Sequence, residues 1–442
     1  MKKVKLLLVF AIVIVMMAAV FSGCGDNSSG DAGDGGGNTT TSGDSGSSGG
    51  GGASADKITL QFYSWCMTQE WLDAMMEAAL YPDHPEIYVE LIEVYSPEEY
   101  IQGQKMHLLN GTIDMTAARP ESVVEYYEAG YMMDLTGQPF MDRFTSEQLK
   151  NITFDGKVWG IPGTVDYVGV YYNKTMFEEN GWGVPGTWDE FVALLDTIKD
   201  SGVVKAPMTN GGRELWVMIM DTAPFFHGIQ VDDPDVYQKI NRGEAKWTDD
   251  NMLKMFTDID NFYKAGYIHP DLVSLSMDDA HSLFLNKEET ALIIQGNFFG
   301  QWFMDYGAEF EVGVFAMPYP GLDNPADQVI PLLIADHNFI AASTKYPEEC
   351  LLVLDAFCSP EASIVRSEMQ GCITTSPAPG AKVNDYLKLF LPLLEYPSEP
   401  FFWCEYNPAV STLLNKNMQE MFMGMMTPQE MVESLQAEQD RS

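Results

Sequence analysis

The chain has 442 residues, enough for about two or three domains and a well-buried core. It carries 64 acidic residues against 25 lysines and arginines, a formal net charge of −39. This charge argues against nucleic acid and anionic lipid surfaces as partners and leaves sugars and peptides open. The six histidines are scattered without the spacing of zinc ligands, so no metal or other cofactor is expected.

Residues 1–23 predict a secretory signal peptide. Three lysines precede an apolar run from Leu6 to Phe21 that is too short to span a membrane comfortably. The run ends in "VFSGC", which resembles the bacterial lipobox, with Phe21 where leucine is usual. We therefore expect lipidation of Cys24 and anchoring to the membrane; plain secretion is the alternative.

Residues 24–55 predict a disordered tether behind the lipidated cysteine. They are almost wholly Gly, Ser, Asp, Thr and Asn, which offer no apolar surface to offset the entropy of ordering. A coil of this length spans on the order of 30 Å. We expect it to hold a globular body away from the membrane.

From Lys57 onward, predicted strands and helices alternate. "KITLQFYSW" predicts a strand, "QEWLDAMMEAAL" a helix and "IYVELIEVY" a second strand. Ser96, Pro97 and Glu99 have the order of an N-cap, a first helical residue and a capping-box partner. Further on, "TALIIQG" and "EVGVFAMPYP" predict strands, while "PEECLLVLDAFCS" and "MTPQEMVESLQAEQD" predict helices. The alternation favours parallel sheets covered by helices on both faces.

The stretch "GWGVPGTWDEF", residues 181–191, contains the G-x-G-x-x-G spacing of a dinucleotide-binding loop. Such a loop follows a strand, whereas the preceding "NKTMFEEN" has a helical pattern that ends at Gly181. Thr187, with Glu190 three residues later, predicts a capping box and a new helix. The stretch is therefore interpreted as helix, turn, helix, and nucleotide binding is not expected.

Five cysteines follow Cys24, and they are Cys66, Cys350, Cys358, Cys372 and Cys404. An odd number leaves at least one thiol unpaired, and none of the spacings is C-x-x-C. Two of them lie in the apolar stretch "CLLVLDAFC". We expect buried thiols that act as small hydrophobic side chains, with a disulfide as the alternative.

Four motifs follow one another between residues 155 and 190: "DGK", "GIP", "YYNK" and "PGTWDE". In this order they are similar to the crossover region of the extracellular solute-binding proteins of ABC importers, the carbohydrate-type group that includes maltose-binding protein. Weaker agreement in "YYEAGYMMDLT", "FLNKEETALIIQGNFF" and "TPQEMVESLQ" extends the resemblance over nearly everything from Lys57 to the C-terminus.

The resemblance implies an α/β, two-lobe, periplasmic-binding-protein-like fold with a hinge and an interlobe cleft. Lobe 1 is expected to comprise residues 56–165 and 330–376, and lobe 2 residues 166–329 and 377–442. The chain is expected to cross between lobes near 164–167 and again near 327–331. Strand ends would then surround one crevice, where open sheets bind ligands.

Candidate ligand-binding residues follow from the same resemblance. The cleft acid of the family falls on Asp166, and Trp65 follows the first strand, where family members often contact ligand. Two contacts, Arg119 and Glu121, are expected after "GTIDMTAA", although Ile113 replaces the usual proline. For each, a packing or capping role is the structural alternative.

Three loops supply the remaining candidates. The family has a tryptophan two residues after the glycine of "ALIIQG"; Phe298 stands there, so either Phe298 or Trp302 is the stacking platform. The other candidates are Arg213, Glu214 and Trp216 in "NGGRELW", and Trp403, Glu405 and Tyr406 in "PFFWCEYN".

We therefore expect a lipid-anchored, monomeric, non-catalytic subunit that captures a carbohydrate, in particular an oligosaccharide, and delivers it to the permease subunits of an ABC importer. One alternative is a surface glycan hydrolase with paired carboxylates, although no catalytic signature stands out. Another keeps the fold and binds a ferric ion or a polyamine. The adjacent Tyr171 and Tyr172 motivate the iron version.

Overall fold

The computed structural model describes residues 57–65, 67–94, 97–285, 289–334, 336–370, 372–374, 385–402 and 408–441. The predictions for the signal peptide, Cys24, the tether, Ser96, Cys66 and Cys404 lie outside these residues, as do those for Trp403, Glu405 and Tyr406. Within the described ranges, no helix is long and apolar enough to cross a membrane.

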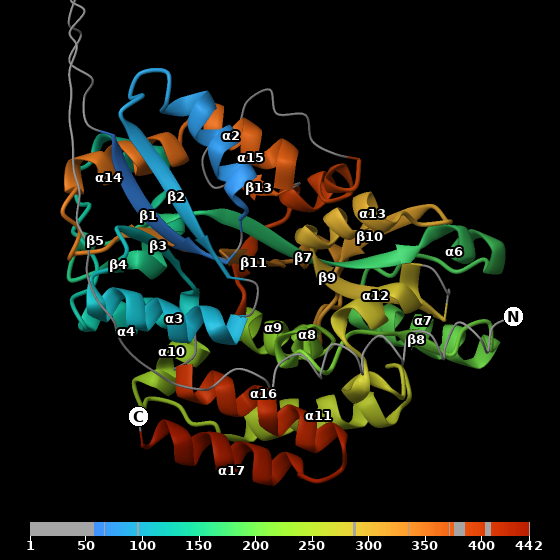
Figure 1. Ribbon diagram of the computed structural model, residues 1–442. Coiled ribbons are helices and arrows are strands. Elements are labelled where there is room, and N and C mark those ends of the chain that lie inside the picture. The colour runs from blue at the N-terminus through green and yellow to red at the C-terminus, as the bar shows by residue number, and fades with distance from the viewer. Residues whose placement is uncertain are drawn as a thin grey trace, which may run out of the picture. The chain divides into compact units, whose positions relative to one another are not determined.

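The first sheet has five strands in the order β2-β1-β3-β12-β6 (Figure 1). The strands are β1 (Ile58–Ser64), β2 (Ile87–Glu93), β3 (Met115–Ala118), β6 (Ile161–Pro162) and β12 (His337–Ile340). β1 pairs in parallel with β2 and β3, with Ile58 opposite Ile87, and β12 is antiparallel to β3 and β6.

Helices cover both faces of this sheet because the strand residues alternate between two apolar cores. Leu60 and Phe62 of β1 contribute to one core, and Tyr63 contributes to the other. The first core includes residues of α2 (Gln69–Ala79), α14 (Pro347–Phe357) and α15 (Pro360–Gln370). The second includes residues of α3 (Pro97–Asn110) and α4 (Val123–Glu128).

The second sheet has the order β14-β11-β7-β9-β8, with β10 and β13 also paired to β7. Its strands are β7 (Thr164–Asn173), β8 (Ala206–Met208), β9 (Thr290–Gly296), β10 (Val312–Ala316), β11 (Ile330–Ile334), β13 (Ile373–Thr374) and β14 (Ser398–Pro400). β7 runs antiparallel to β9, β10, β11 and β13, whereas β8–β9 and β11–β14 are parallel pairs. The expectation of parallel sheets is therefore wrong for the strands around β7.

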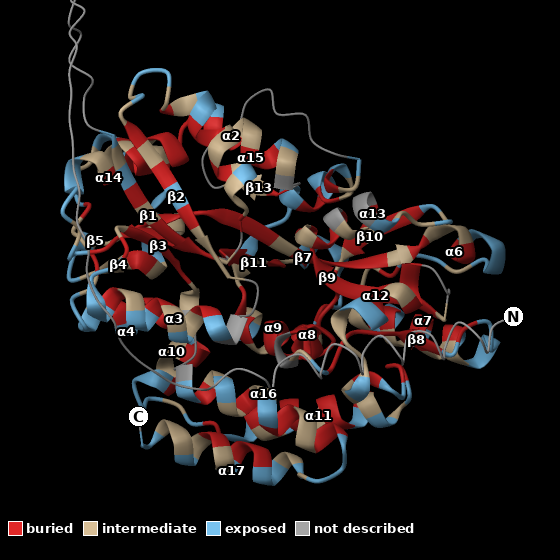
Figure 2. Cartoon of the chain, in the orientation of Figure 1, coloured by how far each residue is buried: buried red, intermediate tan, exposed pale blue. Residues whose placement is uncertain are grey.

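β7 and β9 are buried along most of their length (Figure 2). Val168 and Val170 face one core, and Tyr171 faces the other. Besides α14 and α15, the α-helices that the structure describes after β7 are α6 (Lys174–Asn180), α7 (Trp188–Ser201), α8 (Leu215–Met220), α9 (Ala223–Asp232), α10 (Val236–Asn241), α11 (Asp250–Lys264), α12 (Met277–Leu285), α13 (Gly300–Tyr306), α16 (Pro408–Phe422) and α17 (Pro428–Gln439). Three smaller elements precede it: α5 (Ser146–Leu149), β4 (Thr153–Phe154) and β5 (Lys157–Val158).

The glycine-containing stretch at 181–191 is a turn between two helices, as predicted. α6 ends at Gly181, whose φ of 68° lies in the left-handed region, and the Thr187 side chain caps α7 by accepting from Glu190 N. The predicted capping box is incomplete, because the Glu190 carboxylate accepts from Gly186 N at 2.8 Å instead of from Thr187 N. At Thr427 both halves of the box form.

The cysteines within the described residues are buried free thiols, which confirms the prediction for Cys350, Cys358 and Cys372. Burial raises the pKa of the Cys350 thiol to about 12 and that of the Cys358 thiol to about 11. Cys358 also accepts a hydrogen bond from Arg143 Nη1 at 3.2 Å.

Within the described residues, the chain changes from one sheet to the other at three places. The first is between β6 and β7, directly before the expected 164–167, and the third is between α15 and β13. The second lies between β11 and β12, later than the expected 327–331, because Ile330–Ile334 pairs with β7 and β14. These pairings join β11 to the second sheet, although the sequence assigned residues 330–376 to lobe 1; the lobe boundaries stay predictions.

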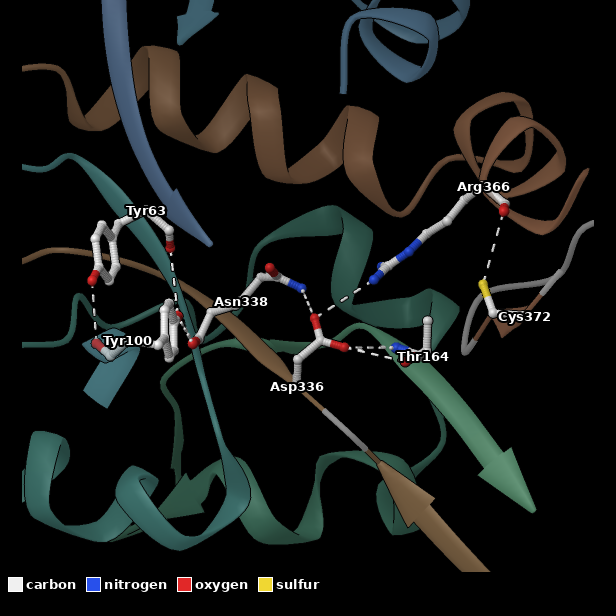
Figure 3. Close-up of polar contacts among 8 residues, drawn as sticks. Tyr63, Tyr100, Thr164, Asp336, Asn338, Arg366 and Cys372 are labelled. Carbon is white, nitrogen blue, oxygen red and sulfur yellow. Dashed lines mark hydrogen bonds and ion pairs between the residues drawn. The ribbon is translucent and has the colours of Figure 1, made fainter. Parts of the chain in front are cut away.

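The Asp336 carboxylate connects these crossing segments (Figure 3). Its Oδ1 accepts from Thr164 N and Thr164 Oγ1, both at 3.2 Å, and its Oδ2 accepts from Asn338 Nδ2 at 3.0 Å. Arg366 Nη2 of α15 lies 3.7 Å from the same Oδ2, and both side chains are almost fully buried. A Cβ at Gly163 would collide with this carboxylate. One buried ion therefore links residues from all three crossings.

Replacing Arg366 by methionine is expected to destabilise the protein by about 3–5 kcal/mol, because it leaves the buried Asp336 carboxylate without its cation. Urea unfolding followed by tryptophan fluorescence measures this loss. Lys388→Met serves as the control, since Lys388 pairs with Asp385 on the surface and its removal should cost no more than about 1 kcal/mol. Equal effects of the two substitutions would contradict the structural role of Arg366.

Candidate functional site

Trp65 and Arg119 meet at the carboxyl edge of the first sheet. Trp65 follows β1 directly, and Arg119 follows β3 directly. Because β1 and β3 are parallel neighbours, their carboxyl ends lie at the same edge. The Arg119 guanidinium carbon lies 5.3 Å from the centroid of the Trp65 ring, a cation–π contact. The structure thus brings together two of the predicted ligand-binding residues.

The Trp65 indole has an unused donor. Its Nε1 is buried, and none of the described residues accepts a hydrogen bond from it. The ring is itself only partly buried and lies 6.2 Å from the Tyr100 ring. Glu121 lies in the short helix Pro120–Ser122 after Arg119, but its side chain is outside what the structure describes.

Asp166 lies near the carboxyl end of β9 in the second sheet. β7 runs antiparallel to β9 with Val168 opposite Gly296, so Asp166 is beyond the last residue of β9. The residue after β9, Asn297, donates from Nδ2 to Asp166 Oδ1 at 3.0 Å. Asn297 Oδ1 accepts from Tyr167 N at 2.6 Å. Sequence reasoning missed Asn297, although it adjoins the "ALIIQG" strand and Phe298.

The environment of Asp166 disfavours its ionised form. The residue is 4% exposed, and burial, followed by the neighbouring Asp336 charge, raises the pKa of its carboxyl to about 7. The Asn297 hydrogen bond and the Arg366 charge act in the opposite direction. A carboxylate with this pKa changes its charge near neutral pH.

Phe298 and Trp302 differ in their surroundings. The half-buried Phe298 ring lies against Gly296, where a Cβ would overlap the ring. The Trp302 ring packs edge-to-face on His281 at 4.5 Å and stacks on Tyr306 at 5.4 Å. The choice of stacking platform between the two rings stays open.

The loop after β8 uses its predicted residues in local contacts. Glu214 Oε2 accepts from Met277 N at 2.8 Å and so binds the first residue of α12. Arg213 is exposed, and its Nη2 donates to Ser274 O at 3.1 Å. Trp216 belongs to α8, but its side chain is not described. The Glu214 contact links this loop to the start of α12.

A second buried polar group, which sequence reasoning also missed, lies at the ends of β8 and β9. Asn210 Nδ2 donates to Asp221 Oδ1 at 3.1 Å, and Gln295 Nε2 donates to Asn210 Oδ1 at 2.7 Å. His281 Nε2 lies 3.5 Å from Gln295 Nε2. Burial raises the pKa of the Asp221 carboxyl to about 7 and lowers that of His281 to about 3. These single polar residues in apolar stretches have no spacing that would have grouped them.

The tyrosine pair that motivated iron binding is divided between the two faces of β7. Tyr171 is fully buried in one core and donates to Gly296 O at 3.3 Å. Tyr172 packs against the opposite core, as expected for consecutive strand residues. The two phenol groups therefore cannot share one ion, and no cluster of three metal-ligating side chains occurs in the described ranges.

Trp65, Arg119, Asp166 and Asn297 together suit a neutral ligand with many hydroxyls. Carboxylate, guanidinium and indole N–H groups supply acceptors and donors, and aromatic rings supply apolar faces. Asp336, whose charge raises the pKa of Asp166, accepts hydrogen bonds from Thr164 through Oδ1 and from Asn338 through Oδ2.

The chain is similar to known extracellular binding proteins. An uncharacterized ABC transporter extracellular-binding protein of Pyrococcus horikoshii is 28% identical over 287 residues, which are 63% of this chain and 64% of that protein. The multiple sugar-binding protein of Streptococcus mutans is 25% identical over 281 residues, 60% of this chain and 63% of that protein. The chain thus spans just under two thirds of the length of these curated relatives.

Solved structures share the fold. A chitin oligosaccharide binding protein superposes with a TM-score of 0.76 at 20% identity, covering 88% of this chain and 99% of its own. A family 1 extracellular solute-binding protein from Bifidobacterium longum subsp. infantis gives 0.71 at 18% identity, with 88% and 100% covered. The fold is therefore the two-lobe α/β fold of these proteins.

Residues 83–383, more than half of the chain, match the family described as bacterial extracellular solute-binding protein. This match, together with the fold and the groups at the strand ends, identifies the chain as a member of the bacterial extracellular solute-binding proteins.

Proposed function

We propose that this protein is the substrate-binding subunit of an ABC importer and captures a carbohydrate, in particular an oligosaccharide, between its two lobes. The observation that carries the proposal is the pairing of Trp65 with Arg119 at one strand edge and of Asp166 with Asn297 at another. Charge-assisted hydrogen bonds from such groups contribute about 1.5–3 kcal/mol each, so a few of them with one stacked ring support micromolar binding. Glu121, Trp216, Trp403, Glu405 and Tyr406 remain further candidate contacts.

Membership of an extracellular family implies an extracytoplasmic location. The proposal adds that Cys24 is lipidated after cleavage, that residues 24–55 tether the body to the membrane, and that the monomer delivers its ligand to permease subunits. The lipobox-like "VFSGC" and the Gly/Ser-rich stretch support the anchor. The relative named as a multiple sugar-binding protein and the structural neighbour named as a chitin oligosaccharide binding protein support the ligand class.

A thermal-shift panel of mono- and oligosaccharides is expected to find at least one stabilising sugar. A ligand at 100 times its Kd stabilises the folded state by about 2.7 kcal/mol. Chromatography of the same mixtures checks for products. A shift without turnover agrees with the proposal, whereas release of shorter sugars would favour the hydrolase, and the lack of any shift would contradict carbohydrate binding.

Asp166→Asn is expected to weaken the best sugar at least tenfold at pH 8, because an amide cannot replace an ionised acceptor. Isothermal titration calorimetry measures the change in Kd. The matched control is Asp221→Asn, which alters another buried carboxylate whose pKa is raised to about 7 and which also accepts from an asparagine. Unchanged affinity in Asp166→Asn would remove this residue from the site.

Asp166→Asn is also expected to stabilise the ligand-free protein increasingly as the pH rises from 5 to 7. The pKa of Asp166 is about 7 when folded and 3.8 by its ordinary value, so the folded state holds its proton more tightly. The contribution of Asp166 to stability is therefore fully present below pH 4 and is lost as the pH approaches 7, by about 1.4 kcal/mol per pH unit. The difference in Tm between variant and wild type, measured at several pH values, should grow and then level off above pH 7. A constant difference would contradict the raised pKa.

A further inference from the structure

The Asn297 side chain lies between the Asp166 carboxylate and the backbone of β7, the strand that carries Asp166. Its side chain is fully buried and uses both ends of the amide, Nδ2 toward Asp166 Oδ1 and Oδ1 toward Tyr167 N. The backbone N–H can only donate, so the amide oxygen must face it and the amide nitrogen must face Asp166. The orientation of Asn297 is thus fixed by the backbone of β7.

We infer that Asn297 is a positioning residue, which holds the Asp166 carboxylate in one rotamer and favours its ionised form for ligand binding. This role rests on the proposed function and assigns a residue that acts on the ligand only through Asp166. A donor amide stabilises a carboxylate more than a carboxylic acid. Because one oxygen of Asp166 is engaged by Asn297, the carboxylate keeps its other oxygen for a sugar hydroxyl.

The other charged and titratable groups around Asp166 cannot replace this donor. Asp336, in the segment before β12, raises the pKa of Asp166, and Arg366 on α15 lowers it from a position paired with Asp336. Tyr171 on β7 and Cys372 before β13 also interact with the Asp166 charge, and burial raises the pKa values of both, so both are protonated and neutral at pH 7. Their hydrogens are donated elsewhere, from Tyr171 to Gly296 O and from Cys372 to Arg366 O. Asn297 is the amide donor that the structure records on Asp166.

Asn297→Asp tests the role with almost no change in shape. The new carboxyl keeps an acceptor for Tyr167 N, but it faces Asp166 with an oxygen in place of an N–H. Two carboxyl groups at this distance share a proton, so the pKa of the pair rises above that of Asp166 alone. We expect sugar affinity at pH 7 to fall at least tenfold and the midpoint of its pH dependence to rise by at least one unit.

The matched control is Asn210→Asp, which places a carboxyl beside the buried Asp221 at the end of α8. It makes the same chemical change away from Asp166 and is expected to lower Tm without moving the pH midpoint of sugar binding. The swap variant Asp166→Asn/Asn297→Asp again pairs an amide donor with a carboxylate acceptor. It moves the carboxylate from position 166 to position 297. It should regain most of the Tm lost in Asn297→Asp without regaining affinity, because the ligand meets an amide at position 166.

Two measurements separate this inference from the proposed function. The first follows Tm against pH without ligand, and Asn297→Asp should shift the midpoint of the Asp166-dependent change upward. The second titrates the best sugar of the thermal-shift panel at pH 5 to 9. Failure of every sugar to bind the wild type would overturn the proposed function. A folded Asn297→Asp variant with the wild-type ligand-free midpoint, or a swap variant with wild-type affinity, would overturn the positioning role alone.

Discussion

The arrangement of the two sheets depends on one buried ion, the Asp336 carboxylate. A carboxylate removed from water is strongly destabilising unless donors and a counter-charge replace its hydration. Here Thr164, Asn338 and Arg366 supply them, each from a segment next to a different crossing of the chain. Gly163 leaves the space that the carboxylate needs. Because the three crossings share this one charge, a shift of any crossing would disturb the contacts of the other two. The strand ends that carry the candidate site adjoin these crossings.

The candidate site follows from the direction of the strands on either side of this ion. Parallel pairing of β1 with β3 brings Trp65 and Arg119 to one edge, and the antiparallel pairing of β7 with β9 brings Asp166 to the end of β9. The candidate binding groups thus come from residues that are distant in sequence but lie at or next to the ends of buried strands. Two of these side chains lie in environments that do not favour folding. The Trp65 indole N–H has no acceptor among the described residues, and the pKa of the Asp166 carboxyl is raised to about 7. Unpaired polar groups and shifted pKa values of this kind are typical of ligand-binding sites.

Much of this fold was predictable from local sequence. "TALIIQG" is the strand Thr290–Gly296, and the end of α6 at Gly181 follows from its left-handed conformation. Strand direction was less accessible, because hydrophobic alternation carries no information on whether β7 runs parallel or antiparallel to its neighbours. The position of a candidate residue was predictable where it follows a strand, as Trp65 follows β1, and its role in binding stays a prediction. It was not predictable where tertiary contact decides the role: Glu214 binds the start of α12, and Arg366 lies on a helix with no local sign of its distant partner Asp336.

The three buried thiols have a consequence for how such a chain matures outside the cytoplasm. Disulfide exchange requires a thiolate, and burial keeps Cys350, Cys358 and Cys372 protonated far above neutral pH. These three thiols, the cysteines among the described residues, are therefore inert toward oxidoreductases and small-molecule oxidants in an oxidising compartment, and they contribute to rigidity by packing. In the unfolded chain the same cysteines are exposed and have ordinary reactivity. Outside the cytoplasm, folding must therefore bury these thiols before they are oxidised.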